Sequence, residues 1–199
     1  MRKKVSAGIL GLAVAGTSLL ATGSASSHGY TDQPLSRQKQ CANGTVTGCG
    51  NIQWEPQSVE GPKGFPAAGP ADGKICSAGI GGFSALDHPK APNGTDWPAT
   101  QLSNGQSYNF RWQFTARHRT TDFKYYITKN GWNQSAPLTR AALESQPFLT
   151  LPYNGQQPPA TLTHTGNVPS GKSGRHIILA VWTVHDTANA FYACSDVRF

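Results

Sequence analysis

Strict alternation of aromatic and polar residues between Ser107 and Phe114 constrains the fold of this chain more than any other stretch. The aromatic side chains are Tyr108, Phe110, Trp112 and Phe114, and the polar ones are Ser107, Asn109, Arg111 and Gln113. Because successive side chains of a β-strand point to opposite faces, the aromatic residues share one face and the polar residues the other. The stretch is therefore predicted to be a half-buried strand.

Four further strands are expected after this one. They are an alternating stretch at Phe123–Ile127, an edge strand at Thr161–Thr165, a central strand apolar on both faces at Ile177–Val184, and a last strand at Phe191–Val197. One short helix is expected at Leu138–Ser145, and no long amphipathic helix. Short strands separated by turns predict an all-β fold, a two-layer antiparallel sandwich.

Proline and glycine interrupt the segment from Gly29 to about Gln106, which is expected to consist mostly of loops and turns. A segment this long without regular structure is either disordered or functional. Its aromatic residues and cysteines favour an ordered insertion between the first strands, with short helical turns inside it. No internal repeat or linker divides the chain, so residues 28–199 are expected to form a single domain.

Residues 1–27 have the three parts of a secretory signal peptide. A basic start at Arg2–Lys4 precedes an apolar run from Val5 to about Ala21, and small residues lead to Ser27. A membrane anchor is the alternative, but it needs about 20 apolar residues, and this run is shorter and interrupted by polar residues. The protein is therefore expected to be secreted and extracellular. A cut after Ser27 makes His28 the first residue, whereas a cut two residues earlier leaves Ser26 first.

Much of the positive charge of the chain belongs to this leader. The 17 basic and 10 acidic residues give a formal charge of +7, and removing Arg2, Lys3 and Lys4 lowers it to +4 (7 − 3). The case for nucleic-acid binding weakens accordingly. We expect the exported protein to be a monomer with neither a nucleic-acid nor a membrane partner.

All four cysteines, Cys41, Cys49, Cys76 and Cys194, lie in the exported part, where disulfides persist. Cys41 and Cys49 enclose a segment rich in glycine, asparagine and threonine that can close on itself, which leaves Cys76 to pair with Cys194. The sequence permits three pairings, and we favour this one. Zinc binding is the alternative, but no Cys-x-x-Cys spacing occurs.

An amino-terminal histidine offers two nitrogen ligands from one residue. Its α-amine has a pKa of roughly 8, so a metal can displace the proton near neutrality. The Nδ1 atom of His28 can close a chelate ring with that amine. One further imidazole would give three nitrogens in a plane, which suits Cu(II) and, by ligand type, also Ni(II) or Zn(II).

His118 is the candidate for that further imidazole. The alternation stops just before it and a loop begins, so a rigid strand carries His118 to the rim of the sandwich. Taken alone, a histidine between Arg117 and Arg119 is more often a solvated surface residue. His118 becomes a candidate ligand because His28 and a specific run before the last strand, Asp186–Tyr192, accompany it.

At these places the sequence resembles the small bacterial lytic polysaccharide monooxygenases, auxiliary activity family ten, which were once described as chitin-binding proteins. The matching pieces are His28-Gly29, Trp54–Gly61, Thr115–His118 and Asp186–Tyr192. They extend over the exported chain in the order of the family. The resemblance implies an immunoglobulin-like or fibronectin III-like sandwich.

The resemblance also implies a single copper ion on the surface of this sandwich. His28 would supply its amine and Nδ1, and His118 its Nε2. Phe191 would pack at one axial position and Ala116 would crowd the other. Glu60 would be the acid beside the copper. The residues that would line a flat substrate-binding face are Trp54, Glu55, Glu60, Asp186 and Asn189.

The implied reaction is oxidative cleavage of crystalline chitin. It reduces Cu(II) with an external electron donor, uses O₂ or H₂O₂ as co-substrate, and removes hydrogen from the sugar beside the glycosidic bond, with oxidation expected at C1. Three alternatives stay open: the same chemistry on cellulose, a non-catalytic chitin-binding protein, and a secreted adhesion or structural sandwich.

Two hydrolase classes find no support in the sequence. A glycosidase needs two facing carboxylates across a cleft, and the ten acidic residues offer no evident pair beyond Glu55 and Glu60. The Gly-x-Ser-x-Gly motif of serine hydrolases is absent. For Glu60 and Asp186 the ordinary alternative is a role in a turn or cap.

Overall fold

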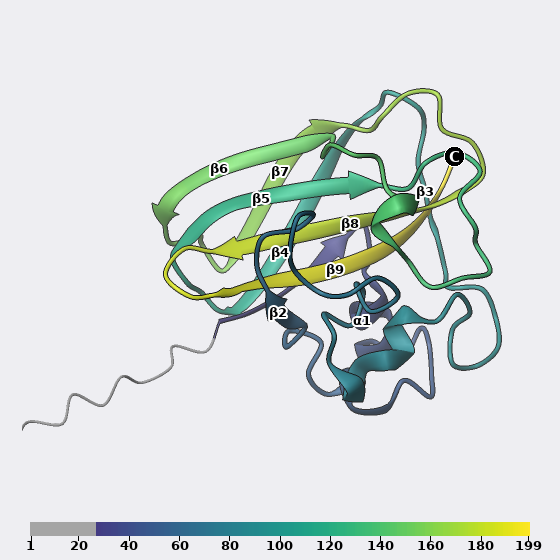
Figure 1. Cartoon of the computed structure of the whole chain (residues 1–199), viewed down its shortest axis with the longest axis horizontal. Coiled ribbons are helices and arrows are strands. Elements are labelled where there is room, and N and C mark those ends of the chain that lie inside the picture. The colour runs from purple at the N-terminus through teal and green to yellow at the C-terminus, as the bar shows by residue number, and fades with distance from the viewer. Residues whose placement is uncertain (1–26) are drawn as a thin grey trace, which may run out of the picture.

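Two β-sheets pack face to face in the computed structural model, which describes residues 27–199 (Figure 1). The signal-peptide prediction concerns residues that, apart from Ser27, lie outside the described part. The strands are β1 (His28–Gln33), β2 (Glu60–Pro62), β3 (Thr100–Gln101), β4 (Ser107–Ala116), β5 (Thr120–Ile127), β6 (Leu149–Gln156), β7 (Thr161–Asn167), β8 (Arg175–Val184) and β9 (Asn189–Arg198). The helical elements are α1 (Arg37–Ala42) and the 3-10 turns η1 (Gly50–Gln53), η2 (Gly81–Asp87) and η3 (Arg140–Ala142).

The smaller sheet has the order β1-β4-β7, and the larger has the order β2-β9-β8-β5-β6. Neighbouring strands in both orders are antiparallel, and β3 adds to β9 in parallel. This arrangement confirms the predicted antiparallel sandwich. The predicted edge strand is β7 and the predicted central strand is β8, which lies between β9 and β5.

Aromatic side chains from both sheets fill the space between the layers. The rings of Trp112 and Trp182 are 6.1 Å apart and those of Phe114 and Trp182 are 4.7 Å apart. Both tryptophans are fully buried, and burying one large apolar side chain contributes about 1.5–3 kcal/mol. The aromatic face predicted from the alternation in β4 therefore forms the core, with its polar partners facing outward.

The long insertion between β1 and β4 forms a second core together with side chains of β8 and β9 of the larger sheet, on which it packs (Figure 1). Its centre includes Ile52, Ile75, Leu86 and Trp97, all fully buried. The prediction of an ordered insertion with short helical turns is correct. Two disulfides, Cys41–Cys49 and Cys76–Cys194, have the pairing that the sequence favoured, and the second ties the insertion to β9.

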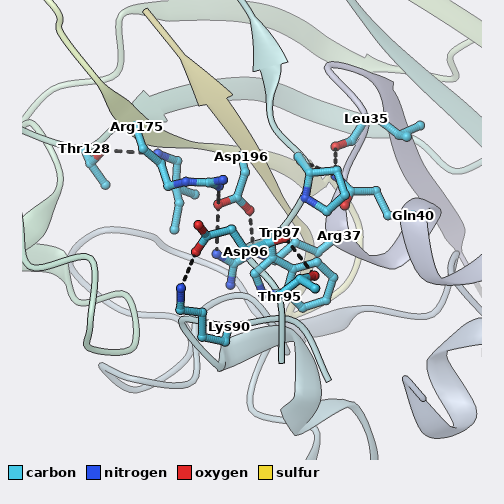
Figure 2. Close-up of polar contacts among 12 residues, drawn as sticks. Leu35, Arg37, Gln40, Lys90, Thr95, Asp96, Trp97, Thr128, Arg175 and Asp196 are labelled. Carbon is cyan, nitrogen blue, oxygen red and sulfur yellow. Dashed lines mark hydrogen bonds and ion pairs between the residues drawn. The ribbon is translucent and has the colours of Figure 1, made fainter. Parts of the chain in front are cut away.

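A buried ion-pair network makes a second tie between insertion and sandwich (Figure 2). The carboxylate of Asp196 accepts from Arg37 at 2.7 Å and from Arg175 at 2.8 Å, so it joins α1, β8 and β9. Arg37 also donates to the carbonyl of Leu86 at 2.7 Å and lies over the ring of Trp97. Because every charge has a partner, the network can stay buried.

Three local expectations differ from the structure. The segment after Gly29 was expected to be mostly loop, but its first residues belong to β1, which forms by main-chain pairing with β4 despite its polar sequence. The expected helix at Leu138–Ser145 is only the short turn η3. The strand β6 was not predicted, because Pro152 and Gly155 interrupt its pattern. No helix among residues 27–199 is long and apolar enough to cross a membrane.

Candidate functional site

His28 lies at the corner where the smaller sheet meets the insertion. It is the first residue of β1, and its cross-strand partner is Ala116, the last residue of β4. The backbone N–H of Gly29 donates to the carbonyl of Gln57 at 3.0 Å, so the start of β1 lies between β4 and the loop that precedes β2. Ala116 is half-buried beside it.

Only glycine fits at position 29. A Cβ there would lie 2.9 Å from Cδ1 of Phe114 and 3.2 Å from both the carbonyl of Gln113 and Cζ3 of Trp182. The aromatic core therefore lies directly beneath the strand that carries His28. This close approach sets the position of the His28 backbone relative to both sheets.

His118 lies in the short loop between β4 and β5, two residues beyond Ala116. The hydroxyl of Thr120 donates to the carbonyl of His118 at 3.1 Å and accepts from Nε1 of Trp182 at 2.7 Å. Nε of Arg119 donates to the carbonyl of Gly155 at 3.0 Å. The loop is thus held by the core and by β6.

His28 and His118 share this corner because their strands are paired. Directly opposed Cα atoms in an antiparallel pair are about 4.5–5.5 Å apart, and two residues of chain reach at most about 7 Å further. The Nδ1 atom of His118 lies 2.7 Å from Oδ1 of Asp186, in the turn between β8 and β9. The contact is close but lacks the linear geometry of a good hydrogen bond.

The donor set at the corner fits a copper ion. Metal-binding histidines commonly turn their other ring nitrogen to a carboxylate, which orients the ring. Because Nδ1 of His118 faces Asp186, Nε2 is the nitrogen available to a metal. Together with Nδ1 of His28 and an amine released by a cut before His28, it would make three nitrogen ligands, a set that Cu(II) favours.

Glu60, Phe191 and Asn189 meet where β2 pairs with β9. Glu60 is directly opposite Phe191 in the register, and its Oε1 accepts from Nδ2 of Asn189 at 2.8 Å. Phe191 is fully buried and stacks on Trp182 with ring centroids 4.7 Å apart. A carboxylate therefore stands at the edge of the aromatic core.

Trp54 is the one large hydrophobic side chain of residues 27–199 that is strongly exposed, at 80%. It follows η1, and the half-buried Glu55 comes next in the same loop. Trp54 therefore does not pack inward as an anchor of its loop. An exposed flat ring on an ordered loop is suited to contact with the face of a ligand.

Two supporting residues were not predicted from the sequence. The backbone N–H of Lys63 donates to the carbonyl of Ala188 at 3.0 Å, and its Nζ donates to the carbonyl of Thr187, so Lys63 holds the turn that carries Asp186. Thr120 supports the His118 loop as described above. Neither residue belongs to a recognisable motif, since their roles depend on contacts between distant segments.

Of three remaining histidines, His164 and His176 are buried, whereas His185 lies beside the His118 loop, where its backbone N–H donates to the carbonyl of Arg119 at 2.8 Å. Burial lowers the pKa of His164 to about 4, and its Nδ1 is 2.7 Å from the hydroxyl of Tyr125 in the core. His176 is also buried, with its pKa lowered by burial, and bonds Thr128. His185 is exposed beside Thr121.

Residues 28–197 match the family described as lytic polysaccharide mono-oxygenase, cellulose-degrading. Among solved structures, an AA10 lytic polysaccharide monooxygenase from Streptomyces lividans is 73% identical with a TM-score of 0.86, covering 86% of this chain and 100% of that one. A Bacillus amyloliquefaciens CBM33 in complex with Cu(I) is 42% identical with a TM-score of 0.76, covering 86% of this chain and 99% of that one.

Two curated relatives extend well beyond the matched part. The GlcNAc-binding protein A of Shewanella oneidensis is 45% identical over 100% of this chain and 41% of its own length. The AA10 family lytic polysaccharide monooxygenase C of Mycosarcoma maydis is 51% identical over 86% of this chain and 52% of its own length. The chain thus spans about half, or less, of the length of these relatives.

Proposed function

This chain belongs to the lytic polysaccharide monooxygenase family, and we propose that it carries out copper-dependent oxidative cleavage of glycosidic bonds in crystalline chitin, with oxidation at C1. We propose further that a cut between Ser27 and His28 releases residues 28–199 as one secreted, monomeric domain. An external electron donor and O₂ or H₂O₂ would complete the reaction.

The observation that carries the proposal is the pairing of His28 with Ala116, which brings His28 and His118 to one corner. One copper ion would be held there by the amine and Nδ1 of His28 and by Nε2 of His118. When bound, copper supplies one-electron chemistry toward O₂ or H₂O₂ that amino-acid side chains lack. The contact of His118 with Asp186 at 2.7 Å would fix the orientation of the ring.

The residues around the proposed copper site have separate roles. Phe191 and Ala116 offer no donor atom, so they would add no ligand to a bound copper ion and would leave room only for a small co-substrate. Glu60 has Oε1 engaged by Asn189, and we assign Oε2 to holding a proton or hydrogen-bonding the co-substrate. Because these groups are already in place, the reaction would need little rearrangement of the protein.

A flat face around this corner would bind the polysaccharide. The exposed ring of Trp54 can stack on a pyranose, while Glu55, Glu60 and Asp186 offer groups that bond hydroxyl and acetamide substituents. The relatives named GlcNAc-binding protein A favour chitin, whose sugar is N-acetylglucosamine. Cellulose is the second candidate, because the family description names it.

The test begins with mass spectrometry of the secreted protein, which should find His28 as the first residue. Copper-loaded protein with a reductant is then incubated with crystalline chitin and, in parallel, with cellulose. We expect one Cu(II) per chain and release of C1-oxidised chito-oligosaccharides. Products from cellulose alone would select the second candidate.

Matched controls separate the enzyme from a binding protein. Copper-free protein and the His118→Ala variant should release no oxidised products while still folding. If the wild-type protein binds chitin equally well with and without copper, and its copper-loaded form releases no oxidised products, the chain is a non-catalytic chitin-binding protein.

A further inference from the structure

We propose that Asn189 is a positioning residue that holds the carboxylate of Glu60 in place, an assignment that rests on the proposed function of Glu60. The family resemblance places Asn189 on the substrate-binding face, as a direct contact. The structure instead commits its amide nitrogen to Glu60. The two assignments predict different consequences when Asn189 is replaced.

The register of β2 and β9 sets the geometry of this pair. Glu60 is opposite Phe191, and Asn189 is opposite Pro62, two positions further along both strands. Cross-strand partners and residues two apart in a strand share one face of a sheet, so Glu60, Phe191 and Asn189 lie side by side. Asn189 is the diagonal neighbour of Glu60, within reach of its carboxylate.

The chemistry of the pair decides which way the amide points. An ionised carboxylate only accepts hydrogen bonds, so the NH₂ group of Asn189 must face Oε1 of Glu60, at 2.8 Å. A hydrogen bond to a charged acceptor is stronger than one between neutral groups. The bond restrains the flexible Glu60 side chain to one arrangement. The amide oxygen of Asn189 remains as the acceptor group of that side chain.

Asn189 is itself held in place. Its backbone N–H donates to the hydroxyl of Thr187 at 3.2 Å, and the turn before it is anchored by Lys63. On the other strand, a Cβ at Gly61 would lie 2.6 Å from the carbonyl of Ala78, so β2 packs closely against another segment of the insertion. Both backbones are therefore fixed, and the hydrogen bond sets where the carboxylate stands.

The first measurement uses copper-free protein and reports the hydrogen bond alone. A double-mutant cycle with Asn189→Ala and Glu60→Ala should show coupling in the free energy of unfolding, because each single change leaves the other partner unpaired. Asn189→Asp, which sets two carboxylates against each other, should lower the midpoint of thermal unfolding more than Asn189→Ala. Asn109→Asp makes the same chemical change on the outer face of β4, far from the site, and serves as the control.

The second measurement uses copper-loaded protein on crystalline chitin. Asn189→Ala should lower the rate of oxidised product at saturating chitin about tenfold, since a misplaced reacting group loses rate steeply. Chitin affinity of the copper-free variant should stay within about twofold of wild type, because most of the face is intact. Asn109→Asp should match wild type in both.

A reversed pair distinguishes positioning from general stabilisation. In the double variant Glu60→Gln with Asn189→Asp, the new amide can donate to the new carboxylate, so the unfolding midpoint should return toward wild type. The product rate should stay low, because the carboxylate now stands at position 189. Recovery of the rate together with the midpoint would overturn the assignment.

Two further results would overturn it. One is the absence of coupling in the copper-free cycle. The other is an Asn189→Ala variant that loses chitin affinity but keeps the wild-type rate at saturating chitin, as a direct substrate contact would. If wild-type protein itself releases no oxidised product, the proposed function fails, and the role of Asn189 fails with it even where the coupling is found.

Discussion

The side chains of His118 and Asp186, from the β4–β5 loop and the β8–β9 turn, approach to 2.7 Å between Nδ1 and Oδ1. The contact joins the loop that connects the two sheets to a turn of the larger sheet, at the proposed copper site. His118 is only 11% exposed, whereas Asp186 is 38% exposed. Asp186 can therefore contact His118 on one side and solvent on the other.

Replacing Asp186 should weaken copper binding without unfolding the protein. Loss of a carboxylate behind a metal-binding imidazole typically costs about 10–100-fold in metal affinity. We expect Asp186→Asn at the lower end, because it keeps an oxygen beside Nδ1 of His118, and Asp186→Ala at the upper end. Titration calorimetry with Cu(II) measures the effect. Asp96→Asn, an exposed carboxylate paired with Lys90, should leave copper affinity unchanged.

Gly29→Ala should damage both stability and the site. The added methyl would meet Phe114 at 2.9 Å, and overpacking of this kind costs about 1–3 kcal/mol. Urea unfolding measures the stability, and Cu(II) titration measures the displacement of His28. Gly81→Ala is the matched control, because nothing lies within 4 Å of a Cβ there. Equal stability of the two variants would contradict the close packing of β1.

Trp54→Ala should separate substrate binding from folding. Because the side chain is 80% exposed, the free energy of unfolding should change by less than about 0.5 kcal/mol. Truncating an aromatic anchor typically costs more than about 1 kcal/mol of binding, so chitin affinity should fall about tenfold. Trp54→Tyr keeps a flat ring and should retain most of the affinity. Sedimentation assays with copper-free protein measure the chitin affinity of both variants. Unchanged binding by Trp54→Ala would exclude Trp54 from the substrate-binding face.

Acid should destabilise the sandwich through His164. Burial lowers the pKa of this histidine to about 4 in the folded state, from 6.5 for an unburied histidine in the unfolded chain. Between these pH values the unfolded chain binds more protons, so the free energy of unfolding falls as the pH is lowered, by about 3 kcal/mol in total for this group. Above pH 6.5 the group contributes no pH dependence.

The variant His164→Gln isolates this effect. Glutamine can still accept from the hydroxyl of Tyr125 but does not titrate, so its urea unfolding should depend less on pH between 4 and 7. His185→Gln removes an exposed histidine and should leave the wild-type dependence intact. Identical pH profiles for His164→Gln and wild type would show that the pKa of His164 is the same in the folded and unfolded states, which would contradict this prediction.

The two disulfides should differ in their contribution to stability. Cys76–Cys194 closes a loop 118 residues long, whereas Cys41–Cys49 closes one of only 8. Chain-entropy estimates give the longer loop about 2 kcal/mol more stabilisation. Removing Cys76 and Cys194 together by alanine should therefore lower the free energy of unfolding more than removing the other pair. Denaturant unfolding of the two double variants under the same conditions provides the comparison.

Strands with strong local patterns were predictable, and strands formed by distant contacts were not. The aromatic alternation of β4 and the apolar run of β8 identify these strands, because burial of one or both faces leaves a regular pattern. In β1 and β6, polar residues, proline and glycine hide the pattern. These two strands exist because β4 and β5 present main-chain partners to them.

The candidate site shows the same division. His28, His118 and the Trp54–Gly61 segment can be singled out in the sequence because each has a distinctive residue type in a recognisable context. The hydrogen bond of Asn189 with Glu60 and the support of the turn by Lys63 cannot, since they join residues more than a hundred positions apart. No local rule relates such residues.

The sequence by itself determined the class of fold, the cysteine content and the identity of the chemically distinctive side chains, because these follow from local periodicity and residue type. Only the tertiary structure decided that His28 begins opposite Ala116, that Asp186 reaches His118, and that Asn189 faces Glu60. Those neighbours are set by strand register and by packing of the insertion against β9. Both are global results of burying the whole core.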